Sequence, residues 1–224
     1  MNKELKLSII IKLIAIISCI YGLINTFYGL ISYTYFTTLS NIFILIMLII
    51  FLIRDIRHKE KSNMLYLIKF LATISISLTF FVFLFILAPA YSKGFIEAYK
   101  LYNWGSLCLH FITPLLSIID FFIFDYKYKS KKIHSIYATV PPLIYVGFVI
   151  LLSNLSVRWH DMKAPYNFLN FGSKVGWFGI DLSEYGETSV GIGVFYMIII
   201  LLILFIILGM AFLRIKDKMS MRKK

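Results

Sequence analysis

Residues 107–120 read LCLHFITPLLSIID, and the apolar character continues through Phe124. A helix needs about 20 mostly apolar residues to cross a bilayer, and this segment supplies them. It also carries His110 and Asp120, two ionisable residues in a place where such groups are rare and costly. The segment therefore predicts a membrane-spanning helix, and its polar residues are the first candidates for a function.

The composition of the whole chain is typical of a polytopic membrane protein. Of its 224 residues, 60% are hydrophobic and 15% are charged, and the mean hydropathy is +0.84. The net charge of +12 would suit a nucleic-acid-binding protein. However, the basic residues cluster at the ends of apolar runs, where lipid headgroups and membrane topology account for them. We therefore expect a membrane lipid or a lipid-like substrate as the partner, and no nucleic acid.

Six apolar runs are long enough to span a membrane. They are expected at residues 7–31, 35–53, 65–88, 104–124, 136–153 and 190–213. A long loop, residues 154–189, precedes the last run and is rich in aromatic residues, which usually rest at the membrane interface. A lid over the outer ends of the spans is the alternative for this loop. No internal repeat is visible, so the expected fold is a single all-α domain, residues 1–224.

The distribution of basic residues predicts the orientation in the membrane. Lys and Arg gather near the N-terminus, after the second span, after the fourth span and in the C-terminal tail, whereas the alternate loops are poor in them. The positive-inside rule then places both termini in the cytoplasm and residues 154–189 outside. Because the residue usage is typical of an AT-rich bacterial genome, the expected location is the bacterial cytoplasmic membrane.

The polar residues of the fourth span share one face. On a helical wheel of 100° per residue, an arc of about 120° contains His110, Thr113, Pro114, Ser117 and Asp120. Such a stripe should face other spans or a wet cavity rather than lipid. Pro114 has no backbone N–H, so it is predicted to kink the helix and to free a carbonyl near His110.

A polar pair in the second span lies at a comparable depth. Thr37 and Asn41 share a helix face. At about 1.5 Å per residue, Thr37 lies roughly 5 Å and His110 roughly 10 Å below the outer boundary, so the two side chains can meet. A hydroxyl beside an imidazole is the minimum apparatus of an activated nucleophile. Asp120 lies about 15 Å deeper than His110 and is expected to be a buried structural partner. The alternative is that these groups only form hydrogen bonds between helices.

Motifs for other chemistry are missing from the sequence. It has no P-loop, GxSxG, HExxH or CxxC motif. Cys19 and Cys108 both fall in apolar runs and are interpreted as packing residues. A metal site built from His110, His160 and Asp161 is an alternative, although these residues lack helical ligand spacing. We expect no metal and no cofactor.

Two segments of the chain resemble a known family. The first is residues 35–41, YFTTLSN, and the second is residues 110–124, in which HFITP is followed by Asp120 and FFIF. In order and spacing, along nearly the whole chain, they resemble the predicted six-span membrane proteins of bacteria, which are related to the eukaryotic androgen-induced membrane hydrolases. In the last outer loop the family often reads Tyr-Pro-Phe-Leu-Asp. Here residues 165–170 read PYNFLN, so the proline is displaced and the closing acid is an amide.

The resemblance implies an activity and two catalytic residues. The eukaryotic relatives are threonine-dependent hydrolases that cleave fatty acid esters of hydroxy fatty acids, with a Thr in the second span and a His in a later one. Carried over to this chain, the His is His110. The Thr is Thr37 if the Phe-Thr pair is kept, and Thr38 if the alignment runs back from Asn41; we prefer Thr37.

Two classes of function stay open at this point. In a lipid ester hydrolase, Asn41 is a candidate donor to the oxyanion. The other supporting polar residues are Thr113, Ser117 and Asp120. In a non-enzymatic small transporter, channel or lipid-binding protein, His110 and Asp120 would line a polar path. That path requires polar residues through the whole membrane thickness on several spans, and the third and sixth spans carry few ionisable groups beyond Lys69. A structural membrane protein without chemistry is a third possibility.

Overall fold

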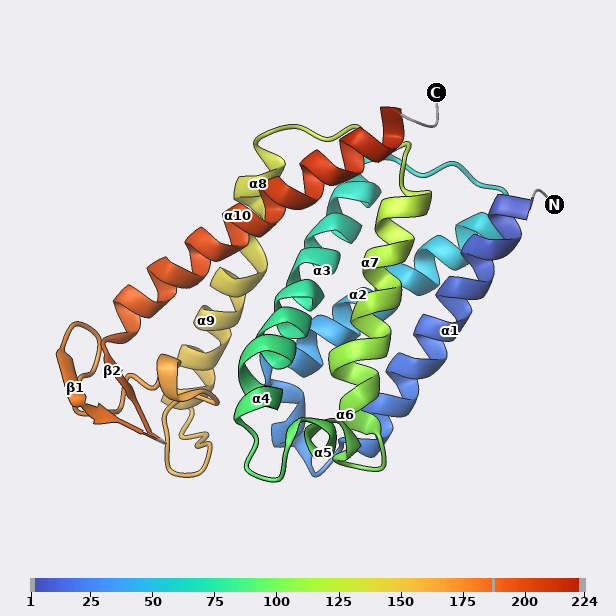
Figure 1. Cartoon of the computed structure of the whole chain (residues 1–224). Helices are drawn as coiled ribbons and strands as arrows, with labels where there is room; N and C mark the ends of the chain where they lie inside the picture. The colour runs from blue at the N-terminus through green and yellow to red at the C-terminus, as the bar shows by residue number, and fades with distance from the viewer. Residues whose placement is uncertain (1–2, 187, 222–224) are drawn as a thin grey trace. The chain divides into compact units, whose positions relative to one another are not determined.

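The computed structural model describes residues 3–186 and 188–221, and it is mostly helical (Figure 1). In this part of the chain six helical segments are long and apolar enough to cross a membrane. They are residues 3–25, 36–56, 63–90, 105–124, 134–154 and 194–221. The prediction of six apolar helices is thereby confirmed. The bounds differ most for the first helix, which runs from Lys3 to Asn25 against a predicted 7–31, and for the last, which runs from Val194 to Met221 against a predicted 190–213.

The helices of the described chain, in order, are α1 (Lys3–Asn25), η1 (Leu30–Thr34), α2 (Phe36–Ile56), α3 (Asn63–Val82), η2 (Phe83–Leu87), α4 (Ala88–Ala90), α5 (Phe95–Lys100), α6 (Gly105–Leu107), η3 (Cys108–Ile112), α7 (Thr113–Phe124), α8 (His134–Tyr137), α9 (Val140–Asn154), η4 (Asn167–Leu169) and α10 (Val194–Met221). The two strands are β1 (Ile180–Tyr185) and β2 (Val190–Ile192). The chain forms two compact units, one of residues 1–138 with 209–224 and the other of residues 139–208.

Four helices enclose the interior of the first unit. Helix α1 packs against α2 and α7, and α3 packs against the same two helices (Figure 1). The N-terminus of α1, the C-termini of α2 and α7, the start of α3 and the end of α10 lie at one end of this bundle, which we call the basic end. The opposite end carries η1, η2, α5 and η3, and we call it the π-bulge end.

The buried face of α1 is its less apolar face. The side chains of Ser8, Lys12, Ala15 and Cys19 are buried at spacings of three and four residues, whereas the isoleucines of α1 are mostly exposed. In water an amphipathic helix would do the opposite and bury its isoleucines. A lipid-facing exterior with small and polar residues between helices is typical of membrane bundles.

Two π-helical turns interrupt the third and fourth spans at the same end of the bundle. In η2 the Ala88 N–H donates to the Phe83 carbonyl, and in η3 the Thr113 N–H donates to the Cys108 carbonyl. In each case the next residue but one after the turn is a proline, Pro89 or Pro114. Proline cannot donate to the next carbonyl, so it prevents the regular helical pattern at that point. The kink predicted at Pro114 is therefore realised as a π-bulge, a feature that is frequent at functional sites.

The second unit contains a hairpin that the all-α prediction missed. Strands β1 and β2 pair antiparallel, with Ile180 opposite Ile192 and Tyr185 opposite Val190. The preceding loop is ordered by Asn170, whose side-chain oxygen accepts from the N–H groups of Lys163 and Gly172 while its amide donates to the Thr188 carbonyl. The sequence does carry a signal for β1, because residues 180–182 alternate apolar, polar and apolar before Gly186.

Candidate functional site

The His110 ring is held by its own helix and by the neighbouring π-bulge. Its Nδ1 lies 2.9 Å from the Ser106 carbonyl oxygen and 3.2 Å from the Ser106 hydroxyl. A carbonyl only accepts, so this bond places the proton on Nδ1 and leaves Nε2 as the acceptor of the neutral ring. The ring stacks on Phe83 of η2, with centroids 4.0 Å apart and planes 24° from parallel. Its orientation is therefore fixed by two adjacent bulges.

Asn41 joins the helix that carries Thr37 to the bulge that carries His110. Its amide nitrogen donates to the Thr37 carbonyl at 2.9 Å and to the Leu109 carbonyl at 3.1 Å. In the π-helical register the Leu109 carbonyl would accept from residue 114, which is a proline without an N–H. Asn41 thus supplies the donor that Pro114 lacks. The Asn41 amide nitrogen consequently lies within hydrogen-bond distance of the Thr37 carbonyl and of the carbonyl of Leu109, the residue before His110.

This arrangement changes the expected role of Asn41. Both amide hydrogens are engaged with backbone carbonyls, so none is left for an oxyanion. Asn41 is fully buried, and the Cys19 thiol donates to its backbone carbonyl at 3.4 Å. The residue acts as a structural bridge at the π-bulge end.

The two candidate nucleophiles differ in exposure. Thr37 is half-buried in the first turn of α2, and Thr38 beside it is buried. Among the described residues, neither hydroxyl has a hydrogen-bond partner. The Thr37 carbonyl also accepts from the Ser40 hydroxyl at 2.9 Å, which ties down this turn further.

Thr113 and Ser117 belong to a polar interior that runs along the bundle. The Thr113 hydroxyl donates to the Ser18 hydroxyl of α1 at 3.1 Å, and the Ser117 hydroxyl donates back to the Thr113 carbonyl at 2.7 Å. Helix α3 adds further buried hydroxyls that the sequence analysis did not single out. They are Thr73, Ser75, Ser77 and Thr79. Their alternation along residues 73–79 was the available signal, since alternate polar residues in an apolar span require buried partners.

Asp120 does not contribute to the His110 site but lies in a buried network of charges. Its carboxylate is 2.7 Å from the Lys12 amine of α1 and 2.5 Å from the Lys69 amine of α3. Lys69 also pairs with Asp125 at 2.6 Å. Lys12 pairs in addition with Asp55 at 3.1 Å. These are the buried partners expected of a carboxylate inside a span.

Most of this network was not predicted. Lys12 is one of the basic residues near the N-terminus that were expected to mark the cytoplasmic side, but it is 1% exposed and neutralised inside the bundle. Asp55, which also pairs with Lys61, and Asp125 were not expected to be functional residues. Burial raises the pKa of the Asp125 carboxyl to about 6, against the opposing attraction of Lys69. The signal available was the spacing of Ser8 and Lys12 in line with Ala15 and Cys19, which places Lys12 on the buried face of α1.

Two residues of the alternative metal site, His160 and Asp161, belong to the second unit. His160 and Asp161 form a tight turn with φ of 46° and 68°, closed by backbone hydrogen bonds between Trp159 and Met162. Within residues 3–186 and 188–221 no group of three His, Cys, Asp or Glu side chains is placed to hold a metal ion.

Comparison of the chain with models of protein families, with curated proteins and with solved structures gives no match. The evidence for a multi-pass membrane protein is therefore the length and apolar composition of its six candidate spans. Any function has to be argued from the geometry of the two ends of the bundle.

Proposed function

We propose that this chain is an integral-membrane hydrolase of lipid esters, such as fatty acid esters of hydroxy fatty acids, with Thr37 as the nucleophile and His110 as the base. The observation that carries the proposal is the Asn41 bridge. The Asn41 amide nitrogen donates both to the Thr37 carbonyl and to the carbonyl of Leu109, the residue before His110, and so keeps the two segments together. The Nδ1 hydrogen bond to Ser106 supports it further, because it leaves Nε2 free of a proton and able to accept one.

In the proposed reaction the Thr37 hydroxyl oxygen attacks the acyl carbon while His110 Nε2 takes the hydroxyl proton. The tetrahedral intermediate collapses when the bond to the alcohol oxygen breaks, and the imidazolium returns the proton to this leaving oxygen. Water then attacks the acyl-threonine ester, with His110 again taking a proton and returning it to the threonine oxygen. The products are a free fatty acid and the hydroxylated leaving group, and no cofactor is required.

The half-buried position of Thr37 favours it over Thr38 as the nucleophile, because a substrate must reach the attacking oxygen. We further propose that both termini face the cytoplasm of a bacterial cell, as the basic residues indicate. The π-bulge end would then lie in the outer leaflet, where a lipid substrate arrives laterally.

The decisive experiment assays purified wild type and five variants on fatty acid esters of hydroxy fatty acids. Thr37→Ala and His110→Ala should each lower the rate by about 100-fold or more, since general-base catalysis alone contributes 10²–10⁴-fold. Matched controls are Thr26→Ala, whose hydroxyl bonds its own helix at Gly22, and His58→Ala at the exposed part of the basic end. Both controls should keep full activity. Retained activity in Thr37→Ala with loss in a Thr38→Ala variant would move the nucleophile to Thr38, and retained activity in His110→Ala would refute the mechanism.

The buried hydroxyls of α3 and α7 favour a second candidate, a polar path for a small solute. They provide polar groups between the π-bulge end and the charges near Asp120, as a path requires. However, the hydroxyls of Thr73, Ser77 and Ser117 donate back to carbonyls of their own helices, which is the ordinary way to satisfy them in a span. Flux of protons or small solutes into liposomes, abolished by Ser77→Val, together with no hydrolysis, would favour the path over the hydrolase.

A further inference from the structure

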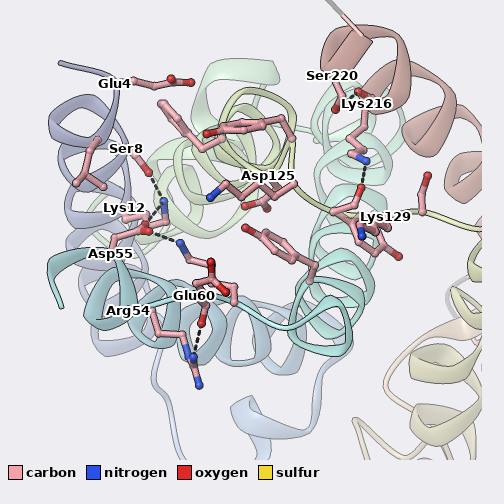
Figure 2. Close-up of a pocket in the computed structure, with 18 of the residues that line it drawn as sticks. Glu4, Ser8, Lys12, Arg54, Asp55, Glu60, Asp125, Lys129, Lys216 and Ser220 are labelled. Carbon is pink, nitrogen blue, oxygen red and sulfur yellow. Dashed lines mark hydrogen bonds and ion pairs between the residues drawn. The ribbon is translucent and has the colours of Figure 1, made fainter. Parts of the chain in front are cut away.

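The basic end of the bundle contains a pocket that the hydrolase proposal does not use. It has a volume of about 1080 Å³ and lies among the start of α1, the α2–α3 loop, the segment after α7 and the end of α10 (Figure 2). Ligand pockets in proteins usually measure 300–1,000 Å³, so this space can hold a group larger than a single phosphate. Its position at the ends of the spans is the level at which lipid headgroups lie.

Three of the five acidic residues that line the pocket are ion-paired with lysines. Asp55 is paired with both Lys12 and Lys61, and Figure 2 shows Lys12 and Asp55 close together at the pocket. Asp125 is paired with Lys69 from the bundle interior, and Asp217 is paired with Lys216. The lining as a whole carries seven Lys and Arg side chains against five Asp and Glu side chains, so its net charge is positive.

Several cations of the lining are not neutralised. Among the described residues, Arg54, Lys59, Lys127 and Lys129 line the pocket and form no ion pair with a carboxylate. Within residues 3–186 and 188–221 the Arg54 guanidinium donates to one acceptor, the Glu60 backbone carbonyl at 2.6 Å, so most of its N–H groups remain available. The pocket therefore offers a planar guanidinium and mobile amines to an anion, the combination that suits phosphate oxygens.

From the size, charge and position of this pocket, we infer that it binds the phosphate-bearing headgroup of an anionic phospholipid. Basic pockets between membrane helices are suited to such headgroups, because the lipid's acyl chains stay in the bilayer while the phosphate reaches the cations. This binding is independent of ester hydrolysis at the other end of the bundle.

The experiment compares the full chain in phosphatidylcholine nanodiscs with and without phosphatidylglycerol, using native mass spectrometry to count bound lipid and Tm to measure stabilisation. Phosphatidylglycerol should remain bound to the wild type and raise its Tm. The variant Lys127→Gln/Lys129→Gln should weaken this binding by about tenfold or more, as expected when two cations near the headgroup are lost. The matched control is Lys131→Gln/Lys132→Gln, because it removes the same charge from the same segment at residues outside the pocket lining.

Each outcome decides the inference. Weaker binding in the Lys127/Lys129 variant alone supports the pocket. Equal binding in both double variants, or none in the wild type, refutes it. Soluble glycerol phosphate is added to the phosphatidylcholine sample as a further arm. If it raises the Tm as much as the lipid does, the ligand is a free phosphate ester and the lipid assignment is wrong.

Discussion

The two ends of the four-helix bundle hold buried polar groups in different ways. At the π-bulge end, neutral groups are satisfied by hydrogen bonds, with Asn41 replacing the donor that Pro114 removes. At the basic end, opposite charges are buried against each other, with Asp120 between Lys12 and Lys69. The first arrangement fixes the backbone beside His110. The second holds α1, α2, α3 and α7 together by ion pairs.

The difference shows which end tolerates change. Losing one neutral hydrogen bond costs the desolvation of the group left behind, about 1–3 kcal/mol. Removing one partner of a buried ion pair leaves an uncompensated charge and costs about 3–5 kcal/mol. The basic end should therefore decide whether the protein folds, and the π-bulge end should decide how the His110 site is shaped.

The largest effect is expected from Asp120→Leu. This change leaves Lys12 and Lys69 with one carboxylate partner each in a site where both lysines are buried. The free energy of unfolding should fall by about 3–5 kcal/mol, measured by denaturant titration in detergent micelles. The control is Glu97→Leu, which breaks the exposed ion pair between Glu97 and Lys100 and should cost about 1 kcal/mol or less. Similar losses in the two variants would contradict the structural role of Asp120.

An intermediate loss of stability is expected from Asn41→Leu at the π-bulge. Asn41→Leu leaves the Leu109 carbonyl without its donor and should cost about 1–3 kcal/mol. In a Pro114→Ala background the new N–H at residue 114 can satisfy that carbonyl, so the same change should cost about 1 kcal/mol less. A double-mutant cycle measures this coupling energy. The control cycle uses Pro89→Ala, which alters the other bulge and should leave the cost of Asn41→Leu unchanged. Additive costs in both cycles would mean that Asn41 does not replace the missing donor.

The parts of this architecture that could be predicted from sequence are those with a local signal. Six long apolar runs and a proline beside His110 are visible in single segments, and both appear in the structure as expected. The charge network joins Lys12, Asp55 and Asp120 from helices far apart in the sequence, and no single segment shows that they meet. The depth of Asp120 along its helix correctly predicted that it lies away from His110. Depth alone does not show that its partners are Lys12 and Lys69.

The role of Asn41 was mistaken for a related reason. A side-chain amide near a candidate nucleophile fits an oxyanion donor. However, the second amide hydrogen of Asn41 bonds the Leu109 carbonyl, which lacks a helical donor because of the π-bulge. The bulge itself follows from Pro114, but its register could not be read from the proline alone. The hairpin in the second unit was overlooked because the surrounding apolar runs favoured helices throughout.

The smallest effect is a pH dependence that should separate the two ends. Burial raises the pKa of Asp125 from its ordinary 3.8 to about 6, with Asp120 adding to the rise and Lys69 and Lys12 opposing it. A raised pKa in the folded state means that the protonated carboxyl is favoured there. Its contribution to stability is therefore fully present below about 4 and is lost as the pH rises through about 6.

Asp125→Asn is neutral at every pH and lacks this contribution. The Tm of the wild type relative to Asp125→Asn should therefore fall by a few degrees between pH 5 and pH 6, as expected for about 1 kcal/mol in a chain of this size. The corresponding difference for Asn41→Leu should stay flat, because Asn41 bonds only uncharged backbone groups and a thiol. A wild-type Tm that instead rises relative to Asp125→Asn over this range would show that the ion pair with Lys69 outweighs burial at Asp125. The ionised Asp125 carboxylate would then stabilise the basic end at neutral pH through its ion pair with Lys69, instead of destabilising it through burial.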